Sequence, residues 1–112
     1  MTTAYERGLE LVALLTAADI VATVDPRGAT PPCVLVTPPT KTYDIGCGFT
    51  AGWQLIALVP GPGNADAFKA LDALETQVAE VLPVTRSTLT QYSLSPDNPS
   101  FPAYRIEYTE GV

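Results

Sequence analysis

Few residues of this chain have side chains that could do chemistry. Its 112 residues include 2 cysteines, 12 acidic residues and no histidine. A cysteine nucleophile such as Cys33 or Cys47 needs a neighbouring base or cation to lower its thiol pKa, and histidine is the usual source. Two cysteines without further cysteine or histidine also fall short of the ligand set of a zinc site. The residue types therefore argue against thiol catalysis and against zinc binding.

Carboxylates and a glycine-rich turn are the remaining candidates. Asp25 and Asp44 are conceivable partners in acid–base catalysis, but no spacing singles out a pair. The turn 60–64, Pro-Gly-Pro-Gly-Asn, precedes a predicted helix, where free backbone N–H groups can bind an anion. It lacks the lysine and the serine or threonine of a phosphate-binding loop, and its prolines remove donors. We therefore expect a structural turn there, no catalytic residue, no metal, no cofactor, and a protein that is not an enzyme.

The composition indicates a single globular domain, residues 1–112, with an acidic surface. Twelve acidic residues against 6 basic ones give a net charge of −6, which disfavours nonspecific binding to phosphate backbones. Hydrophobic residues make up 46% and charged residues 16%, so the chain has enough core formers to fold. The mean hydropathy of +0.17 is high, and a subunit interface is one place for the excess apolar surface.

Targeting and membrane signals are weak. The first seven residues carry both an acidic and a basic side chain, and no apolar run follows a basic leader, so we expect no ordinary secretory signal. The longest apolar stretch, residues 9–24, is interrupted by Glu10 and Asp19 and is shorter than the roughly 20 residues of a membrane span. The expectation is a soluble protein made in a cytoplasm, without a membrane partner.

Hydrophobic residues at spacings of three and four predict two helices, residues 4–18 and 65–82. Thr2 or Thr3 is expected to cap the first, with Glu6 completing a capping box after Thr3, and Pro83 to end the second. Arg7 and Glu10 are expected near the solvent side of the first helix. The predicted core stripes are Tyr5, Leu9, Val12 and Leu15, widened by Leu11 and Leu14, and then Phe68, Leu71, Leu74, Val78 and Val81.

Strands are predicted between and after the helices. Residues 53–59 are apolar on both faces, which is typical of a strand in the middle of a covered sheet. The fold class that follows is α+β, with two helices packed on a mainly antiparallel mixed sheet in the order α-β-β-β-β-α-β-β. The predicted strands are residues 20–24, 33–37, 41–47, 53–59, 84–94 and 103–109.

The second and third predicted strands suggest a hairpin that would bring the cysteines together. If they pair antiparallel about Thr40, Val36 faces Asp44 and Cys33 faces Cys47, within disulfide reach. One interpretation is a cross-strand disulfide, formed for example after cell lysis. The other is two buried free thiols acting as small apolar residues. The absence of a secretion signal favours the free thiols.

The order of turn residues and strand residues along the chain resembles one protein family. The run Pro-Pro-Cys-Val-Leu-Val at 31–36, Pro-Pro-Thr at 38–40, Tyr-Asp at 43–44 and Gly-Cys-Gly at 46–48 resembles tail terminator proteins, or minor tail proteins, of long-tailed bacteriophages infecting actinobacteria. The stretch from Trp53 to the Pro-Gly-Pro-Gly-Asn-Ala-Asp-Ala run at 60–67 is similar to the same family, and the likeness covers about residues 20–110. It rests on turns and strands, and the family offers no catalytic residues to carry over.

The resemblance implies a structural role in a virion. It implies a hexameric ring that caps the tail tube at the neck-proximal end, stops tube polymerisation and joins the tail to the head connector. The implied partners are further copies of the chain, the tail tube protein and a connector or stopper protein, with DNA only passing through the lumen. Six subunits would carry roughly −36 charges, and an acidic lumen repels passing DNA rather than holding it.

Two proline-rich segments are candidate contacts with neighbouring subunits or the tube, namely the expected hairpin tip at 38–42 and the loop at 95–102. Their prolines reduce the ordering cost of binding, although ordinary exposed loops would look the same. Two other functions stay open: a head–tail joining or stopper protein of the neck, and a small monomeric binding module unrelated to virions. The candidate contact residues are Pro38, Pro39, Thr40, Lys41, Thr42, Asp97, Asn98, Pro99 and Phe101.

Overall fold

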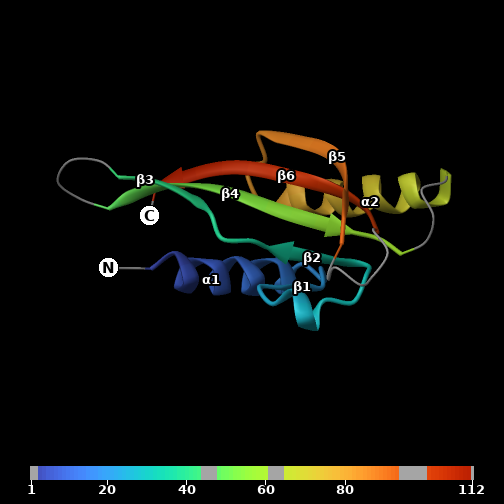
Figure 1. Ribbon diagram of the computed structural model, residues 1–112, viewed down its shortest axis with the longest axis horizontal. Helices are drawn as coiled ribbons and strands as arrows, with labels where there is room; N and C mark the ends of the chain where they lie inside the picture. The colour runs from blue at the N-terminus through green and yellow to red at the C-terminus, as the bar shows by residue number, and fades with distance from the viewer. Residues whose placement is uncertain (1–2, 44–47, 61–64, 94–100, 112) are drawn as a thin grey trace.

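A computed structural model of the protein describes residues 3–43, 48–60, 65–93 and 101–111 (Figure 1). In these residues two α-helices pack on a six-stranded mixed sheet, which confirms the predicted α+β class and element order. A short 3₁₀ helix, η1 (Pro26–Gly28), follows the first strand. The other elements are α1 (Ala4–Ala17), β1 (Ala22–Thr23), β2 (Cys33–Val36), β3 (Thr40–Tyr43), β4 (Phe49–Leu58), α2 (Ala65–Val81), β5 (Arg86–Tyr92) and β6 (Phe101–Gly111).

Strand β4 is the centre of the sheet, as its apolar character on both faces predicts. The strand order is β1-β2-β4-β6-β5, with β3 also paired to β4. The ladder between β4 and β6 is the longest, running from Thr50 opposite Gly111 to Leu58 opposite Ala103. Strand β1 runs parallel to β2, and the other pairs are antiparallel. The sheet is therefore organised around one long antiparallel pair, β4 and β6 (Figure 1).

The predicted hairpin between β2 and β3 is wrong, because both strands pair with β4. Cys33 lies opposite Leu58, and Tyr43 lies opposite Phe49, so β2 and β3 follow one another along the same side of β4. Residues 37–39 connect them without reversing the chain. Pro38 and Pro39 have no backbone N–H, so they interrupt a ladder without needing to form a turn.

The connection between β2 and β3 also carries one residue more than the strand it faces. Val36 pairs with Leu55 and Thr40 with Gly52, so residues 37–39 lie opposite only Trp53 and Gln54. An extra residue on one strand of an antiparallel pair is a bulge, which leaves part of the ladder unpaired. The predicted partners of Val36 and Cys33, Asp44 and Cys47, lie outside the described residues.

Both helices cover the same face of the sheet. In β4 the side chains of Trp53, Leu55 and Ala57 point to this face and belong to one core with both helices. Helix α1 lies beside β1 and β2, whereas α2 packs on β4 and β6 (Figure 1). The remaining buried members of this core are Leu11, Leu15, Ile20, Val34, Val36, Phe49, Ala51, Val78, Leu82, Ile106 and Tyr108.

The opposite face of the sheet is apolar only near one end. Cys33, Leu35, Ile56, Leu58 and Ala103 form a separate buried cluster there. Among the described residues, Ala29, Tyr92 and Phe101 pack against it. Further along the same face the side chains of β4 and β6 are polar, and two of them, Gln54 and Arg105, are exposed.

The buried side of α1 differs from the predicted stripe. Gly8, Leu11 and Leu15 are buried, whereas Tyr5 is 66% exposed and Leu9 44%. Gly8 explains the rotation, because a Cβ built on it would lie 3.7 Å from Val24 and 3.8 Å from the Trp53 ring. The small residue lets the helix approach the large indole. The predicted cap is confirmed, since the Thr3 hydroxyl accepts a hydrogen bond from the Glu6 N–H.

Helix α2 keeps most of its predicted core stripe, because Leu74 and Val81 pack against the core, and it differs only in its first turn. Ala67, Leu71 and Val78 are buried, whereas Phe68, expected in the core stripe, is 65% exposed. The buried stripe thus begins one residue earlier than the sequence pattern predicts, and the large aromatic side chain is left facing solvent. Within the part of the chain that the structure describes, neither helix is both long and apolar enough to cross a membrane.

The molecule is elongated, with extents of 48 × 31 × 23 Å. Helix α1 begins and β6 ends at one end of the long axis, where β3 also lies (Figure 1). Helix α2 begins at the opposite end. The two ends therefore present different elements to a neighbour.

Candidate functional site

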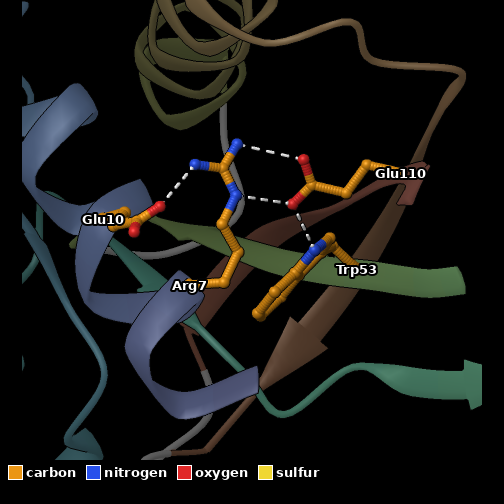
Figure 2. A network of polar contacts seen from close by, with 4 residues as sticks. All are labelled: Arg7, Glu10, Trp53 and Glu110. Atoms are coloured by element: carbon orange, nitrogen blue, oxygen red, sulfur yellow. Dashed lines mark hydrogen bonds and ion pairs between the residues drawn. The ribbon is translucent and has the colours of Figure 1, made fainter. Parts of the chain in front are cut away.

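A charged cluster joins α1 to the middle of β4 and the end of β6 (Figure 2). The Arg7 guanidinium donates from Nε to Glu110 Oε1 at 2.9 Å and from Nη2 to Glu110 Oε2 at 3.0 Å. Its Nη1 donates to Glu10 Oε2 at 2.9 Å. The Trp53 indole Nε1–H donates to the same Glu110 carboxylate at 2.8 Å. One carboxylate from β6 therefore binds side chains of both α1 and β4.

The electrostatics of this cluster favour a structural role. The hydrogen bonds to Glu110 raise the pKa of the Arg7 guanidinium above its usual range, burial opposes this, and the hydrogen bond to Glu10 raises the pKa as well. The side chain of Arg7 is 26% exposed, that of Glu110 19% and that of Glu10 56%. Glu110 accepts three hydrogen bonds from Arg7 and Trp53, so it has little capacity left to take a proton from a substrate.

Tyr108 is a buried neighbour of the charged cluster. It pairs with Trp53 across the β4–β6 ladder, and among the described residues its hydroxyl forms no hydrogen bond of ordinary geometry, although it lies near the Glu110 carboxylate. Burial raises the pKa of this phenol, and the negative charge of Glu110 raises it further. Phenolate formation is therefore suppressed at neutral pH, and the group is a poor general base.

An apolar pocket adjoins the charged cluster, and Trp53 belongs to both. The pocket has a volume of about 180 Å³ and lies between the start of α1 and the connection from β2 to β3. The hydrogen bond from Trp53 to Glu110 restrains the indole that lines it. We call this feature the Trp53 pocket; it is lined by Ala4, Tyr5 and Gly8 of α1, by Val24, Val36 and Trp53, and by residues 37–39.

The chemistry of the Trp53 pocket is that of a binding surface. Its lining side chains are aliphatic, proline or aromatic, apart from the hydroxyls of Tyr5 and Thr37. Such a lining suits an apolar group and offers no cationic side chain for a phosphate. Among the described residues, no group of three or more histidine, cysteine, aspartate or glutamate side chains is placed to hold a metal.

Of the two cysteines, the structure describes Cys33. It is a buried free thiol, and burial raises its pKa, with an opposing contribution from a hydrogen bond to the Thr30 backbone. Cys33 lies opposite Leu58 of β4, whereas the predicted hairpin places it opposite Cys47, so the predicted register is wrong. Cys47 lies outside the described residues.

The predicted contact residues fall in different environments. Pro38 and Pro39 line the Trp53 pocket, rather than forming a hairpin tip. Thr40, Lys41 and Thr42 are exposed on β3. Phe101 is half-buried, pairs with Tyr92 and packs on the second apolar cluster. Asp97, Asn98 and Pro99 lie outside the described residues.

The other candidates from the sequence also resolve into structural roles where they are described. The Asp25 carboxylate caps η1 by accepting a hydrogen bond from the Arg27 N–H at 2.9 Å. This hydrogen bond, together with the Arg27 side chain, lowers the pKa of Asp25. Asp44 and residues 61–64 of the glycine-rich turn lie outside the described residues.

Sequence reasoning missed the charged cluster. Arg7 was expected near the solvent side of its helix, and Glu110 is 103 residues away from it. One signal was present: Tyr104, Ile106 and Tyr108 share a face of the last strand, and the same period of two places Glu110 on that face. A carboxylate at the edge of a core requires a cation or several donors, but the sequence pattern alone does not say which.

Comparison of the chain with protein-family models, with curated proteins and with solved structures finds no match. The fold and the site therefore define the class of the protein on their own: a small α+β domain with an apolar pocket supported by a partly buried charged cluster.

Proposed function

We propose that the protein is a structural virion protein, a tail terminator that forms a hexameric ring on the end of a phage tail tube. The ring stops tube polymerisation and joins the tail to the head connector. The observation that carries this proposal is the run of turns and strands from residue 31 to residue 67, which resembles tail terminators of phages infecting actinobacteria. The partners are further copies of the chain, the tube protein and a connector or stopper protein.

The different ends of the molecule support a ring. Head-to-tail contacts that close by rotation require two different patches on each subunit. The Trp53 pocket is lined by residues from the first half of α1, and Phe68 is exposed in the first turn of α2. The two helices begin toward opposite ends of the long axis (Figure 1). A subunit of this shape can contact one neighbour at each end.

The sheet edges also support assembly. Strand β5 is the last strand on one side, and β3 pairs with β4 on the other. Neither has a second strand partner among the described residues. An unpaired edge has free backbone N–H and C=O groups, to which a strand of another chain can pair.

The acidic charge suits a ring through which DNA passes. A net charge of −6 per chain gives roughly −36 for a hexamer, which repels the DNA phosphates instead of binding them. In this proposal DNA slips through the lumen and is not recognised by its sequence.

The test is to polymerise the tail tube protein of the same virus with and without this protein. We expect shorter tubes with a narrow length distribution in negative-stain images, and gold-labelled protein at one tube end. Tubes of unchanged length with unlabelled ends would contradict the proposal. Binding to the connector without binding to tubes would assign the chain to the joining or stopper proteins of the neck. A chain that binds neither component would be a binding module unrelated to the virion.

A further inference from the structure

We propose that the Trp53 pocket of one subunit receives the Phe68 side chain of the next copy of this chain. This inference rests on the proposed function in one respect, namely that the pocket is occupied by a second copy of the chain. It names the residues of a subunit contact, which neither the sequence pattern nor the resemblance identifies.

The size of the Trp53 pocket fits an aromatic ring. Its volume is about 180 Å³ and most of its lining is apolar. A dry apolar cavity of about 150 Å³ in another protein binds benzene, which is the ring of a phenylalanine side chain. The pocket of this protein therefore has room for one phenyl group with little space left over.

Phe68 is the phenylalanine available to fill it. Phe49 is buried and Phe101 is half-buried, whereas Phe68 is 65% exposed. It lies in the first turn of α2, beside the buried Ala67, so the helix holds its backbone rigidly. Binding would therefore cost little conformational entropy beyond the ordering of one side chain.

The two surfaces lie on different elements of the chain. The pocket is built from the first half of α1 and the connection before β3, and Phe68 is in the first turn of α2. The starts of α1 and α2 lie toward opposite ends of the long axis (Figure 1). A pocket and a side chain at different places on one chain make a heterologous contact, which repeats from subunit to subunit and closes into a ring when the rotation allows.

Charged residues around the two surfaces can pair across this contact. Lys41 is exposed two residues beyond Pro39, and its ammonium lies 4.9 Å from the centre of the Phe49 ring. Asp72 is exposed one helical turn after Phe68. Glu6, next to Tyr5 of the pocket, and Lys69, next to Phe68, offer a second pair of opposite charges. These pairs would fix the orientation of the contact more than its affinity.

The experiment measures self-association of the wild-type chain and three variants by sedimentation and light scattering over a dilution series. Trp53 is the single tryptophan, so its fluorescence reports the pocket directly. Phe68→Ala removes the ring, and Gly8→Met fills the pocket with a flexible apolar side chain. Val21→Ala is the matched control, because Val21 is 65% exposed and lies outside both the Trp53 pocket and the edge strands β3 and β5.

We expect Phe68→Ala and Gly8→Met each to weaken self-association roughly tenfold or more, the scale of burying one aromatic side chain. Val21→Ala should change it less than about twofold, the range of ordinary surface substitutions. A mixture of Phe68→Ala and Gly8→Met chains should form heterodimers, because each variant retains the half that the other lacks. Heterodimers also show that both variants are folded. Association of Phe68→Ala equal to wild type, without a change in Trp53 fluorescence, would overturn the proposal.

Tube ends distinguish failure of this contact from failure of the proposed function. If the chain associates only on tubes, the same variants are scored by end labelling. Tubes capped equally well by wild type, Phe68→Ala and Gly8→Met would refute the contact and leave the terminator role in place. Self-association through Phe68 with unchanged tube lengths would support the contact and refute the terminator role. A strict monomer, alone at about 100 μM and beside tube protein, would refute the contact.

Discussion

At the scale of single residues, Glu110 connects α1, β4 and β6 at the edge of the core. Its carboxylate binds the Arg7 guanidinium through two hydrogen bonds and the Trp53 indole through a third. Two-point binding of a carboxylate by arginine fixes both distance and orientation. The side chain therefore fixes α1 to the sheet and restrains the indole that lines the pocket.

Replacing this carboxylate tests its contribution to stability. Glu110→Gln leaves Arg7 without its main counter-charge in a site that is largely shielded from water, so we expect the free energy of unfolding to fall by about 1–3 kcal/mol. Glu10→Gln removes the more exposed partner of the same arginine and should cost less than about 0.5 kcal/mol. Urea unfolding of both variants measures the difference. Equal losses would contradict the assigned role of Glu110.

Tyr108 offers a prediction with the opposite sign. Its buried hydroxyl lies near the Glu110 carboxylate but forms no hydrogen bond of ordinary geometry among the described residues, so Tyr108→Phe should raise the free energy of unfolding by about 0.5–1 kcal/mol at neutral pH. Tyr5→Phe, at an exposed position, should leave it unchanged. A loss of stability in Tyr108→Phe would show that the hydroxyl forms a bond that stabilises the fold.

The same residue predicts a pH dependence. Burial raises the pKa of Tyr108 above its ordinary value of 10.0, so the unfolded chain loses this proton at lower pH than the folded one. The contribution of the protonated Tyr108 hydroxyl to the free energy of unfolding is fully present below pH 10. It is lost as the pH rises toward the higher pKa of Tyr108 in the folded chain. The thiol of Cys33, whose pKa is also raised from 9.0, acts in the same direction. Urea unfolding between pH 8 and 11 should show this decline, and Tyr108→Phe should reduce it.

At the scale of elements, Gly8 sets how α1 sits on the sheet. It lies inside the helix and faces Val24 and the Trp53 ring, and this contact turns Tyr5 and Leu9 toward solvent. A residue with a large side chain at position 8 would hold the helix away from Trp53 or enter the pocket. The rotation of the helix therefore comes from a residue that adds no hydrophobic surface of its own.

Gly8→Ala separates the stability of α1 from the filling of the pocket. The added Cβ would lie at ordinary van der Waals distances of 3.7 and 3.8 Å from its nearest neighbours. Alanine inside a helix is more favourable than glycine, so we expect the free energy of unfolding to rise by about 0.5–1 kcal/mol. Self-association should weaken at the same time, because the methyl group takes up part of the pocket. A variant that loses stability would show that the contact with Trp53 leaves no room for a methyl group.

At the scale of the whole molecule, the β4–β6 ladder is the structural axis. It joins the two strands nearly along their full length, and the buried side chains of both helices pack on it. Strands β1 and β3, by contrast, are short and lie at the margin of the sheet. Local stability is therefore uneven, and we expect β1 and β3 to unfold locally more often than β4 and β6.

Hydrogen exchange tests this distribution. Amides of β4 and β6 that bond between Leu55 and Ile106 should exchange most slowly, near the rate set by global unfolding. Amides of β3 should exchange orders of magnitude faster in the isolated subunit. On tube ends, slower exchange in β3 or β5 would identify the edge that pairs with another chain, whereas equally fast exchange in β4 and β3 would contradict this account.

Much of the fold could be predicted from the sequence, because periodicity is a local property. The two-faced apolar run 53–59 predicts a central strand, and the structure places β4 there. Thr3 predicts the start of α1, and the spacing of leucines and valines predicts α2. Each of these signals lies within a few residues, where backbone geometry decides the pattern.

The sequence by itself thus determined the α+β class and the element order. Only the tertiary structure decided which strand pairs with which, that Tyr5 and Phe68 face solvent, and that Arg7 and Trp53 both bind Glu110. These outcomes depend on contacts between residues far apart in the chain. Pro38 and Pro39, for example, are compatible both with a reversal of the chain and with a simple interruption of the ladder. The physical reason is that local patterns fix which face of an element is apolar only to within a residue, while close packing selects among the remaining orientations.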